Sequence, residues 1–278
     1  QIAGLPLAPS TTVTVATLEA GAIIRTAFPR TVLPHVRYKG AVNPVTDTDT
    51  ATESFIINRL LTAFPDHRIL AEEGGFVNGN QTPASATDAP MWVVDPLDGT
   101  NNFAHGFPHI AISLALQIEG QTVVGVIHDP LRGETFAAMR DGGCTLNGET
   151  VHASPTAHLA DAFLGAGFPY DRRTAADNNT ERLDHFLRRS QGVRRAGSAA
   201  LDLAYVACGR LDGFFEIRLS PWDIAAGVLL VCEAGGQVTD FEGLPTGLNG
   251  ETVLASNSLI HQEMLRVIRE GASAPIPE

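Results

Sequence analysis

The chain has few of the residues that build disulfide-rich or membrane-spanning proteins. Its three cysteines, Cys144, Cys208 and Cys232, are odd in number and far apart. No Cys-x-x-Cys pair or histidine at ligand spacing accompanies them, so we expect no zinc site, no disulfide framework and a reducing, cytoplasmic setting. No apolar run approaches the ~20 residues that cross a bilayer. We also expect no signal peptide, since no basic stretch precedes an apolar one near the first residue.

Positive charge is also scarce. The sequence has 19 Lys and Arg residues against 31 Asp and Glu residues, a formal net charge of −12. Such a chain repels phosphate backbones and anionic lipids, so we expect no direct nucleic-acid binding and no membrane partner. The surplus of carboxylates suits either a solvated acidic surface or a site that holds cations, and composition alone does not decide between them.

The rest of the composition is that of an ordinary globular protein, with 44% hydrophobic residues in 278, a length that allows one large domain or two. Apolar spacing predicts helices over 11–28, 51–63, 178–189, 198–208, 221–233 and 258–269, the first capped by Ser10 or Thr11. Strand patterns cover 68–71, 91–94, 110–118, 122–127, 134–138, 162–165, 213–217 and 237–240, with another strand near Val193. An antiparallel run followed by alternating strands and helices predicts a layered α/β fold.

The most specific signal is the segment from Asp95 to Thr100, Asp-Pro-Leu-Asp-Gly-Thr. We expect a buried strand to end at Asp95, Pro96 to stop its pairing, and Asp98 to return so that two carboxylates face one point. Such oxygen clusters suit Mg²⁺, and the Leu97 carbonyl can add a ligand. A helix opening at Thr100 would turn free N–H groups toward an anion. In isolation, an ordinary β-turn explains the same residues.

Four further acids are candidates for the same cluster. Glu72 ends the preceding strand and would lie beside Asp95 if the two strands are neighbours. Asp47 and Asp49 precede a helix, where N-capping is the alternative role. Asp223 lies in the first turn of another helix, where a favourable interaction with the helix dipole is the alternative. Each acid alone is a weak signal.

Together these segments resemble the signature motifs of the inositol monophosphatase family. The resemblance rests on Glu72-Glu73-Gly74, on residues 95–103 and on Trp222-Asp223-Ile224-Ala225-Ala226-Gly227, and residues 194–202 and 213–216 are similar to bacterial members. It implies an alternating α-β-α-β-α sandwich, a layered α/β fold. It also implies one domain over 1–278, with an N-terminal metal-site half of about 1–150 and a C-terminal α/β half of about 151–270.

The activity that the resemblance implies is Mg²⁺-dependent hydrolysis of inositol 1-phosphate by an activated water, without a covalent intermediate. By matching motifs, Glu72, Asp95 and the Leu97 carbonyl hold one ion. Asp95, Asp98 and Asp223 hold a second ion, in a site that takes two or three. Two cations neutralise an anionic ester that otherwise repels its nucleophile. The family's sensitivity to Li⁺ is expected to extend to this site.

Asp49 and Thr100 match the family pair that positions and deprotonates the nucleophilic water, with Glu72 reaching the same region. A slip of two residues in register would put Asp47 in place of Asp49. The backbone N–H groups of Gly99 and Thr100 are expected to cradle the phosphate.

Recognition of the polyol falls by the same resemblance to a set of residues mostly in the second half of the chain, namely Asp98, Gly197, Ser198, Ala199, Glu216 and Asp223. Glu216 ends an apolar strand, where it either accepts hydrogen bonds from substrate hydroxyls or pairs with Arg194 or Arg195. Alternative substrates are fructose 1,6-bisphosphate, histidinol phosphate or a nucleotide 2′- or 3′-phosphate, and another alternative is a non-catalytic regulator associated with transcription. The resemblance also implies a homodimer.

Overall fold

The computed structural model describes residues 8–29, 37–39, 43–79, 89–248 and 250–273. Its α-helices are α1 (Ala8–Ala27), α2 (Asp47–Ala63), α3 (Thr100–Ala104), α4 (Thr180–Leu187), α5 (Ala199–Ala207), α6 (Pro221–Glu233) and α7 (His261–Glu270). Short 3₁₀ turns cover Leu159–Asp161 and Gly271–Ser273. Among the described residues, no helix is both long enough and apolar enough to span a bilayer.

The strands form two large sheets and a small ribbon. The first sheet has the order β10-β9-β8-β7-β6-β5-β3-β4. Its strands are β3 (Arg68–Ala71), β4 (Gly75–Asn78), β5 (Met91–Asp98), β6 (Ala111–Ile118), β7 (Gln121–Asp129), β8 (Glu134–Met139), β9 (Gly143–Leu146) and β10 (Glu149–Val151). The second sheet has the order β12-β11-β13-β15-β14. Its strands are β11 (Phe163–Ala166), β12 (Gly192–Arg194), β13 (Gly213–Ile217), β14 (Gln237–Thr239) and β15 (Thr252–Ser256). The ribbon pairs β1 (Arg37–Lys39) with β2 (Asn43–Val45).

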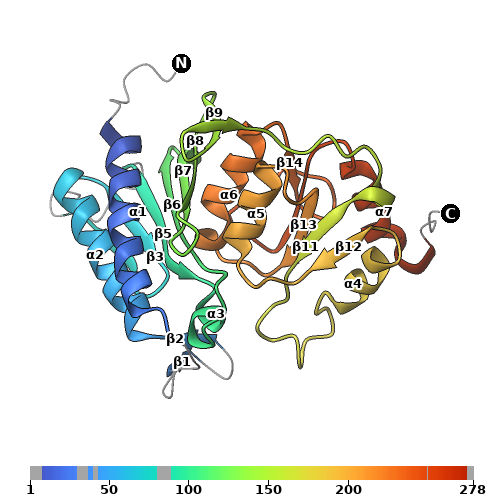
Figure 1. The fold of residues 1–278 in the computed structure, drawn as a ribbon, viewed down its shortest axis with the longest axis horizontal. Helices are drawn as coiled ribbons and strands as arrows, with labels where there is room; N and C mark the ends of the chain where they lie inside the picture. The colour runs from blue at the N-terminus through green and yellow to red at the C-terminus, as the bar shows by residue number, and fades with distance from the viewer. Residues whose placement is uncertain (1–7, 30–36, 40–42, 80–88, 249, 274–278) are drawn as a thin grey trace.

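The elements stack in five layers, which confirms the predicted α-β-α-β-α sandwich. Figure 1 shows α1 and α2 on the outer face of the first sheet, α5 and α6 between the two sheets, and α4 and α7 beyond the second sheet. A separate apolar cluster fills each of three regions: under α1 and α2, around α5 and α6, and beneath α4 and α7. Burial of these apolar faces drives the layering.

The strand pairing places the acidic segments side by side. β3 runs parallel to β5 with Ala71 opposite Val94, so Glu72 follows β3 beside Asp95. This confirms the expectation that the two strands are neighbours. The expectation that Pro96 ends the strand was wrong, because pairing resumes at Asp98 opposite Ala111 after a shift of register between Asp95 and Asp98. The shift accommodates the missing N–H of proline and keeps both carboxylates at the end of the sheet.

Several boundaries differ from the sequence prediction. The first helix begins at Ala8, so Ser10 and Thr11 lie inside it and do not precede it as caps. The second helix begins at Asp47, four residues earlier than predicted, because Thr46 and Asp49 form a capping box that satisfies its first N–H groups. Among the described residues, the strands β1, β2, β4, β9, β10 and β15 were not predicted; they are three to five residues long. Such short strands give little periodic pattern.

Candidate active site

A cavity of about 270 Å³ opens between the two halves of the chain. The first half lines it with residues that follow β3 or belong to the end of β5 and the start of α3: Glu72, Asp95, Leu97, Asp98, Gly99, Thr100 and Asn101. The second half lines it from four segments: 166–170, 195–202, 216–220 and 222–223. Each metal, catalytic and substrate residue expected from the sequence lines this cavity, apart from Asp49, which lies behind Thr100.

Three carboxylates converge at one end of the cavity. One oxygen each of Asp95, Asp98 and Asp223 lies within 4.8 Å of the others. The shifted register of β5 brings the first two together, and the N-terminus of α6 supplies Asp223. Asp223 also caps its helix, because its Oδ2 accepts a hydrogen bond from the Ser220 N–H at 2.7 Å. The capping role and the cluster role therefore coexist in one side chain.

The electrostatics of the cluster suit a cation. Burial, followed by the charges of Glu72, Asp98 and Asp223, raises the pKa of Asp95 well above its usual range. Burial also raises the pKa of Asp98 to about 6, against the opposing effect of hydrogen bonds from Ser198 Oγ at 2.6 Å and the Ala200 N–H at 2.8 Å. Crowded buried carboxylates repel one another, and a divalent cation among them removes that cost. An all-oxygen donor set is the kind that Mg²⁺ prefers.

Thr100 connects the cluster to a buried carboxylate behind it. Its hydroxyl lies 2.9 Å from Asp49 Oδ1 and 3.0 Å from the Leu97 carbonyl oxygen. Asp49 Oδ2 accepts hydrogen bonds from the Thr46 N–H, at 2.9 Å, and from the Thr46 hydroxyl. Burial raises the pKa of Asp49 despite these bonds. Asp49 is 1% exposed whereas Asp47 is exposed, so the structure brings Asp49 and not Asp47 against Thr100.

Gly99 allows the chain to turn from β5 into α3. Its φ of 91° lies in the left-handed region, and a Cβ at this position would lie 2.9 Å from the His109 carbonyl oxygen. Only glycine meets both demands without strain. This turn places the backbone of residues 99 and 100 on the cavity wall.

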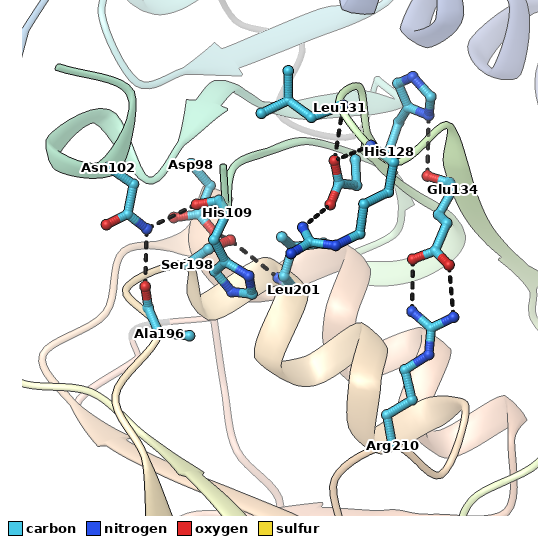
Figure 2. A network of polar contacts seen from close by, with 12 residues as sticks. Asp98, Asn102, His109, His128, Leu131, Glu134, Ala196, Ser198, Leu201 and Arg210 are labelled. Carbon is cyan, nitrogen blue, oxygen red and sulfur yellow. Dashed lines mark hydrogen bonds and ion pairs between the residues drawn. The ribbon is translucent and has the colours of Figure 1, made fainter. Parts of the chain in front are cut away.

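Asn102 joins the two halves of the site. Its Nδ2 donates to the carbonyl oxygens of His109, at 2.7 Å, and Ala196, at 2.9 Å, as Figure 2 shows. In the same view Ser198 lies between Asp98 and Leu201, donating to the first and accepting from the N–H of the second at 3.3 Å. These bonds fix the segment before α5 against the acidic cluster. No role was predicted for Asn102 from the sequence, although this residue lies within the signature segment 95–103.

Glu216 extends from β13 into the cavity. Its carboxylate lies so close to Gly167 that a Cβ there would be 1.9 Å from Oε2, so any larger residue at position 167 would displace the Glu216 carboxylate. Burial, then the charge of Asp202, raises the pKa of Glu216 to about 8. The nearby positive charge of Arg195 and a hydrogen bond from the Phe168 N–H act in the opposite direction. Arg194 points elsewhere, with its guanidinium 4.4 Å from the centre of the Phe163 ring.

Tyr170, Asp202 and Arg218 line the cavity but were assigned no role by sequence reasoning, whereas Arg195, one of the two arginines named as alternative partners of Glu216, also lines it. Asp202 is 2% exposed within α5, and burial with the charge of Asp98 raises its pKa well above the usual range. A single acid in the otherwise apolar run 199–207 was a signal that could have identified it. Tyr170 and Arg218 gave no such signal, because each lies in a polar loop or at a strand end.

Comparisons with known proteins agree with this geometry. Residues 8–273 match the model of the inositol monophosphatase family. The inositol-1-monophosphatase of Synechocystis is 41% identical over 256 residues, covering 92% of this chain and 86% of the relative. The Nus factor SuhB of Pseudomonas aeruginosa is 42% identical over 257 residues, covering 90% and 92%. The solved inositol monophosphatase of Anabaena superposes with a TM-score of 0.83 at 40% identity, covering 96% of each chain.

The chain therefore belongs to the inositol monophosphatase family. This membership makes it a phosphoric monoester hydrolase of a metal-dependent kind, with a phosphate monoester as the class of substrate.

Proposed function

We propose that this protein hydrolyses inositol 1-phosphate to inositol and inorganic phosphate with Mg²⁺ as its cofactor. The observation that carries the proposal is the meeting in one cavity of the three carboxylates within 4.8 Å, the Thr100 hydroxyl and Glu216. The name of the Synechocystis relative, inositol-1-monophosphatase, supports the choice of substrate.

The metal-facing wall, which we define as Glu72, Asp95, the Leu97 carbonyl, Asp98 and Asp223, is the proposed holder of Mg²⁺. Asp95 belongs to both proposed ligand sets, with Glu72 and Leu97 on one side and Asp98 and Asp223 on the other. Mg²⁺ held there would neutralise the phosphate charge and lower the pKa of the attacking water. We propose two ions or three, as the family resemblance implies.

Thr100 and Asp49 handle the nucleophile in this proposal. The Thr100 hydroxyl has one hydrogen to donate, to Asp49 Oδ1 at 2.9 Å or to the Leu97 carbonyl at 3.0 Å. Its oxygen keeps a lone pair that can accept a hydrogen bond from the attacking water. The water proton passes toward Asp49, whose raised pKa makes it a stronger base than an exposed aspartate.

The remaining groups hold the ester in line with the water. The N–H groups of Gly99 and Thr100 face the phosphate oxygens. As the water oxygen bonds to phosphorus, the bond from phosphorus to the inositol oxygen breaks on the side of Asp98 and Asp223, and the departing oxygen takes a proton from solvent water to become the inositol hydroxyl. Glu216 accepts hydrogen bonds from the inositol hydroxyls. The backbone and hydroxyl groups of residues 197–199 donate hydrogen bonds to these hydroxyls or accept them. These contacts form the substrate-facing wall, defined as residues 167–170, 197–199 and Glu216.

A panel of phosphate monoesters tests the proposal. We expect release of phosphate from inositol 1-phosphate in the presence of Mg²⁺ and none after removal of divalent ions. Fructose 1,6-bisphosphate, histidinol phosphate and nucleotide 2′- and 3′-phosphates should have lower kcat/KM values. A higher kcat/KM for any of them would move the proposal to that substrate, since the metal-facing wall contacts only the phosphate.

A non-catalytic role associated with transcription is the second candidate. It is favoured by the relatives named Nus factor SuhB, one of them 42% identical to this chain. Catalysis is the stronger proposal because a pure binding module has no need of Asp49, Thr100 and three convergent carboxylates in one cavity. No phosphate release from any ester in the panel would favour the second role.

We further propose that the chain acts as a homodimer, as the family resemblance implies, and that its two halves work as one domain. The second statement is supported by the cavity, to which both halves contribute residues. Light scattering after size-exclusion chromatography tests the first. Failure of separately expressed halves to bind inositol 1-phosphate would agree with the second.

A further inference from the structure

The loop 167–177 follows β11, and its first residues, 167–170, line the cavity. Near its start, Gly167 lies against the carboxylate of Glu216, and the Phe168 N–H donates a hydrogen bond to that carboxylate. Tyr170 lines the cavity with a half-exposed ring. Glu72 and Asp223 line the same cavity, and burial, followed by the charges of these two groups, raises the pKa of the Tyr170 hydroxyl.

Arg218, which follows the neighbouring strand β13, holds this loop. Its guanidinium donates from Nη1 to Asp171 Oδ1 and from Nη2 to the Asp177 carbonyl oxygen, so one side chain ties down two points six residues apart in the loop. Asp177 is fixed in turn by Arg182, whose Nη1 lies 2.6 Å from Asp177 Oδ1. The loop is thus anchored at both ends, with Tyr170 beside the first anchor.

The backbone of Arg218 pays a conformational cost for this position. Its φ is 57°, in the left-handed region that a long side chain rarely occupies. Such residues persist where the surrounding structure compensates them, and they cluster at functional sites. Glycine would fit this backbone without strain. The contribution of the arginine is therefore its side chain, which makes the two hydrogen bonds to the loop that glycine could not make.

We propose that Arg218 is a positioning residue for substrate selection: by binding Asp171 and the Asp177 carbonyl, it holds the 167–177 loop so that Tyr170 and the Phe168–Glu216 contact form the polyol-facing side of the cavity. The inference rests on the proposed function for the identity of the substrate. Arg218 acts through the loop and not on the phosphate, so its loss should weaken binding of inositol 1-phosphate more than it slows the chemical step.

Limited digestion with trypsin tests, without any measurement of activity, whether Arg218 holds the 167–177 loop. The loop contains Arg172 and Arg173, so cleavage within it yields a fragment ending at one of these residues, identified by mass spectrometry. Opening of the loop should expose this site. We expect cleavage about three- to tenfold faster in Arg218→Gly, which loses both bonds and relieves the strained backbone, and a smaller increase in Asp171→Asn, which weakens one.

Two further variants sharpen this test. Arg218→Lys keeps the charge but lacks the fork that reaches both acceptors, so it should restore only part of the protection. Asp184→Asn is the matched control, because Asp184 forms an exposed ion pair with Arg188, at 2.9 Å, on α4. Its cleavage rate should equal that of the wild type. Equal cleavage rates in the wild type and Arg218→Gly would show that Arg218 does not hold the loop.

Steady-state kinetics on inositol 1-phosphate test the consequence for selection. If the closed loop is populated for only a fraction of the time, the apparent affinity falls by that fraction. We expect the KM of Arg218→Gly to rise about three- to tenfold with kcat within about twofold, in the same order of variants as the cleavage rates. A lowered melting temperature with equal losses in kcat and kcat/KM would overturn the positioning role.

The two hypotheses fail in different ways. If the wild-type protein releases no phosphate from inositol 1-phosphate, the proposed function is wrong, while the digestion rates still decide whether Arg218 holds the loop. If the wild type is active and Arg218→Gly keeps the wild-type KM, the inference is wrong and the proposed function stands.

Discussion

The two walls of the cavity differ in how the chain builds them. The metal-facing wall comes largely from residues 95–98, at the end of one buried strand, joined by Glu72 after the neighbouring strand and by Asp223 from the first turn of α6. The substrate-facing wall gathers short segments that lie far apart in sequence, from the loop after β11, the turn before α5 and the end of β13. The shape of the metal-facing wall depends on backbone geometry, whereas the shape of the substrate-facing wall depends on side chains that hold loops in place.

This difference separates two tasks. Asp95, which belongs to both proposed ligand sets, is 1% exposed, and Glu72, Asp98 and Asp223 around it are half-buried, so the metal-facing wall is centred on a side chain fixed within the core. The substrate-facing wall includes the half-exposed Tyr170 and a loop held by the exposed ion pair of Arg218 and Asp171. We infer that the first wall carries the reaction and the second selects the ester. Substitutions in the two walls should therefore give different kinetic signatures.

The largest effect is expected from Asp95→Asn in the metal-facing wall. An amide keeps the shape but removes the charge shared by the two proposed ion sites, so kcat should fall by at least about a thousandfold. The same change relieves repulsion with Glu72, Asp98 and Asp223, so the melting temperature without Mg²⁺ should stay equal or rise. Retention of more than about a tenth of wild-type turnover, a cost of only ~1.4 kcal/mol, would contradict the shared role.

The next effect is expected from Asp49→Asn, with Asp47→Asn as its matched control. Loss of the base that we propose to accept the water proton should lower kcat by about a hundredfold or more, with little change in KM. Asp47 is exposed, so its replacement should leave kcat within about twofold. Turnover numbers and melting temperatures of both variants decide which of the two aspartates acts as the base. A large loss in Asp47→Asn alone would assign the role to that residue instead.

The contrast between the walls also explains what the sequence could predict. Asp95, Asp98 and Thr100 belong to one short motif, so their proximity follows from chain connectivity once a strand is predicted there. Glu72 required only the parallel pairing of two neighbouring strands. Helix α6 was predicted with its observed bounds, Pro221–Glu233, because a proline near its start, Asp223 in the first turn and a long apolar run all agree.

The missed features depend on long-range packing. Tyr170 and Arg218 meet the cavity only because the β11 and β13 strands lie next to each other in the second sheet. The left-handed backbone of Arg218 contradicts local preference and is stabilised by contacts about forty residues away in sequence, with Asp171 and Asp177. Local residue patterns do not predict such long-range contacts. The pairing of Asn102 with Ala196 was missed for the same reason.

In the substrate-facing wall, Glu216→Gln should impair inositol 1-phosphate far more than glycerol 2-phosphate. Above pH 8, where Glu216 is ionised, a charge-assisted hydrogen bond from a ring hydroxyl is worth about 1.5–3 kcal/mol, so kcat/KM for the first ester measured there should fall about ten- to a hundredfold. The metal-facing wall is unchanged, so the second ester should be affected by less than about threefold. Equal losses for both esters, with a lower melting temperature, would mean that Glu216 serves stability and not selection.

The smallest effect, a shift of melting temperature with pH, distinguishes the two walls without any substrate. Burial raises the pKa of Asp98 to about 6 and of Glu216 to about 8, above the values expected in the unfolded chain. These two groups therefore bind more protons in the folded protein than in the unfolded chain between pH ~4 and those pKa values. Their contribution to the free energy of unfolding should accordingly be largest near pH ~4 and fall as the pH rises, the reverse of an ordinary ion-paired carboxylate.

Mg²⁺ should cancel only part of this fall. An ion in the metal-facing wall favours the deprotonated form of Asp98, so the loss of stability up to about pH 6 should diminish when Mg²⁺ is present. Glu216 is not among the proposed ligands, so a decline of a few degrees between pH 6 and 8 should persist in the wild type with Mg²⁺. Glu216→Gln has no such charge to bury and should lose that decline. If the decline persists in this variant, the titrating group lies outside Glu216; if Mg²⁺ abolishes it in the wild type, the two walls share one electrostatic site and the distinction between them does not hold.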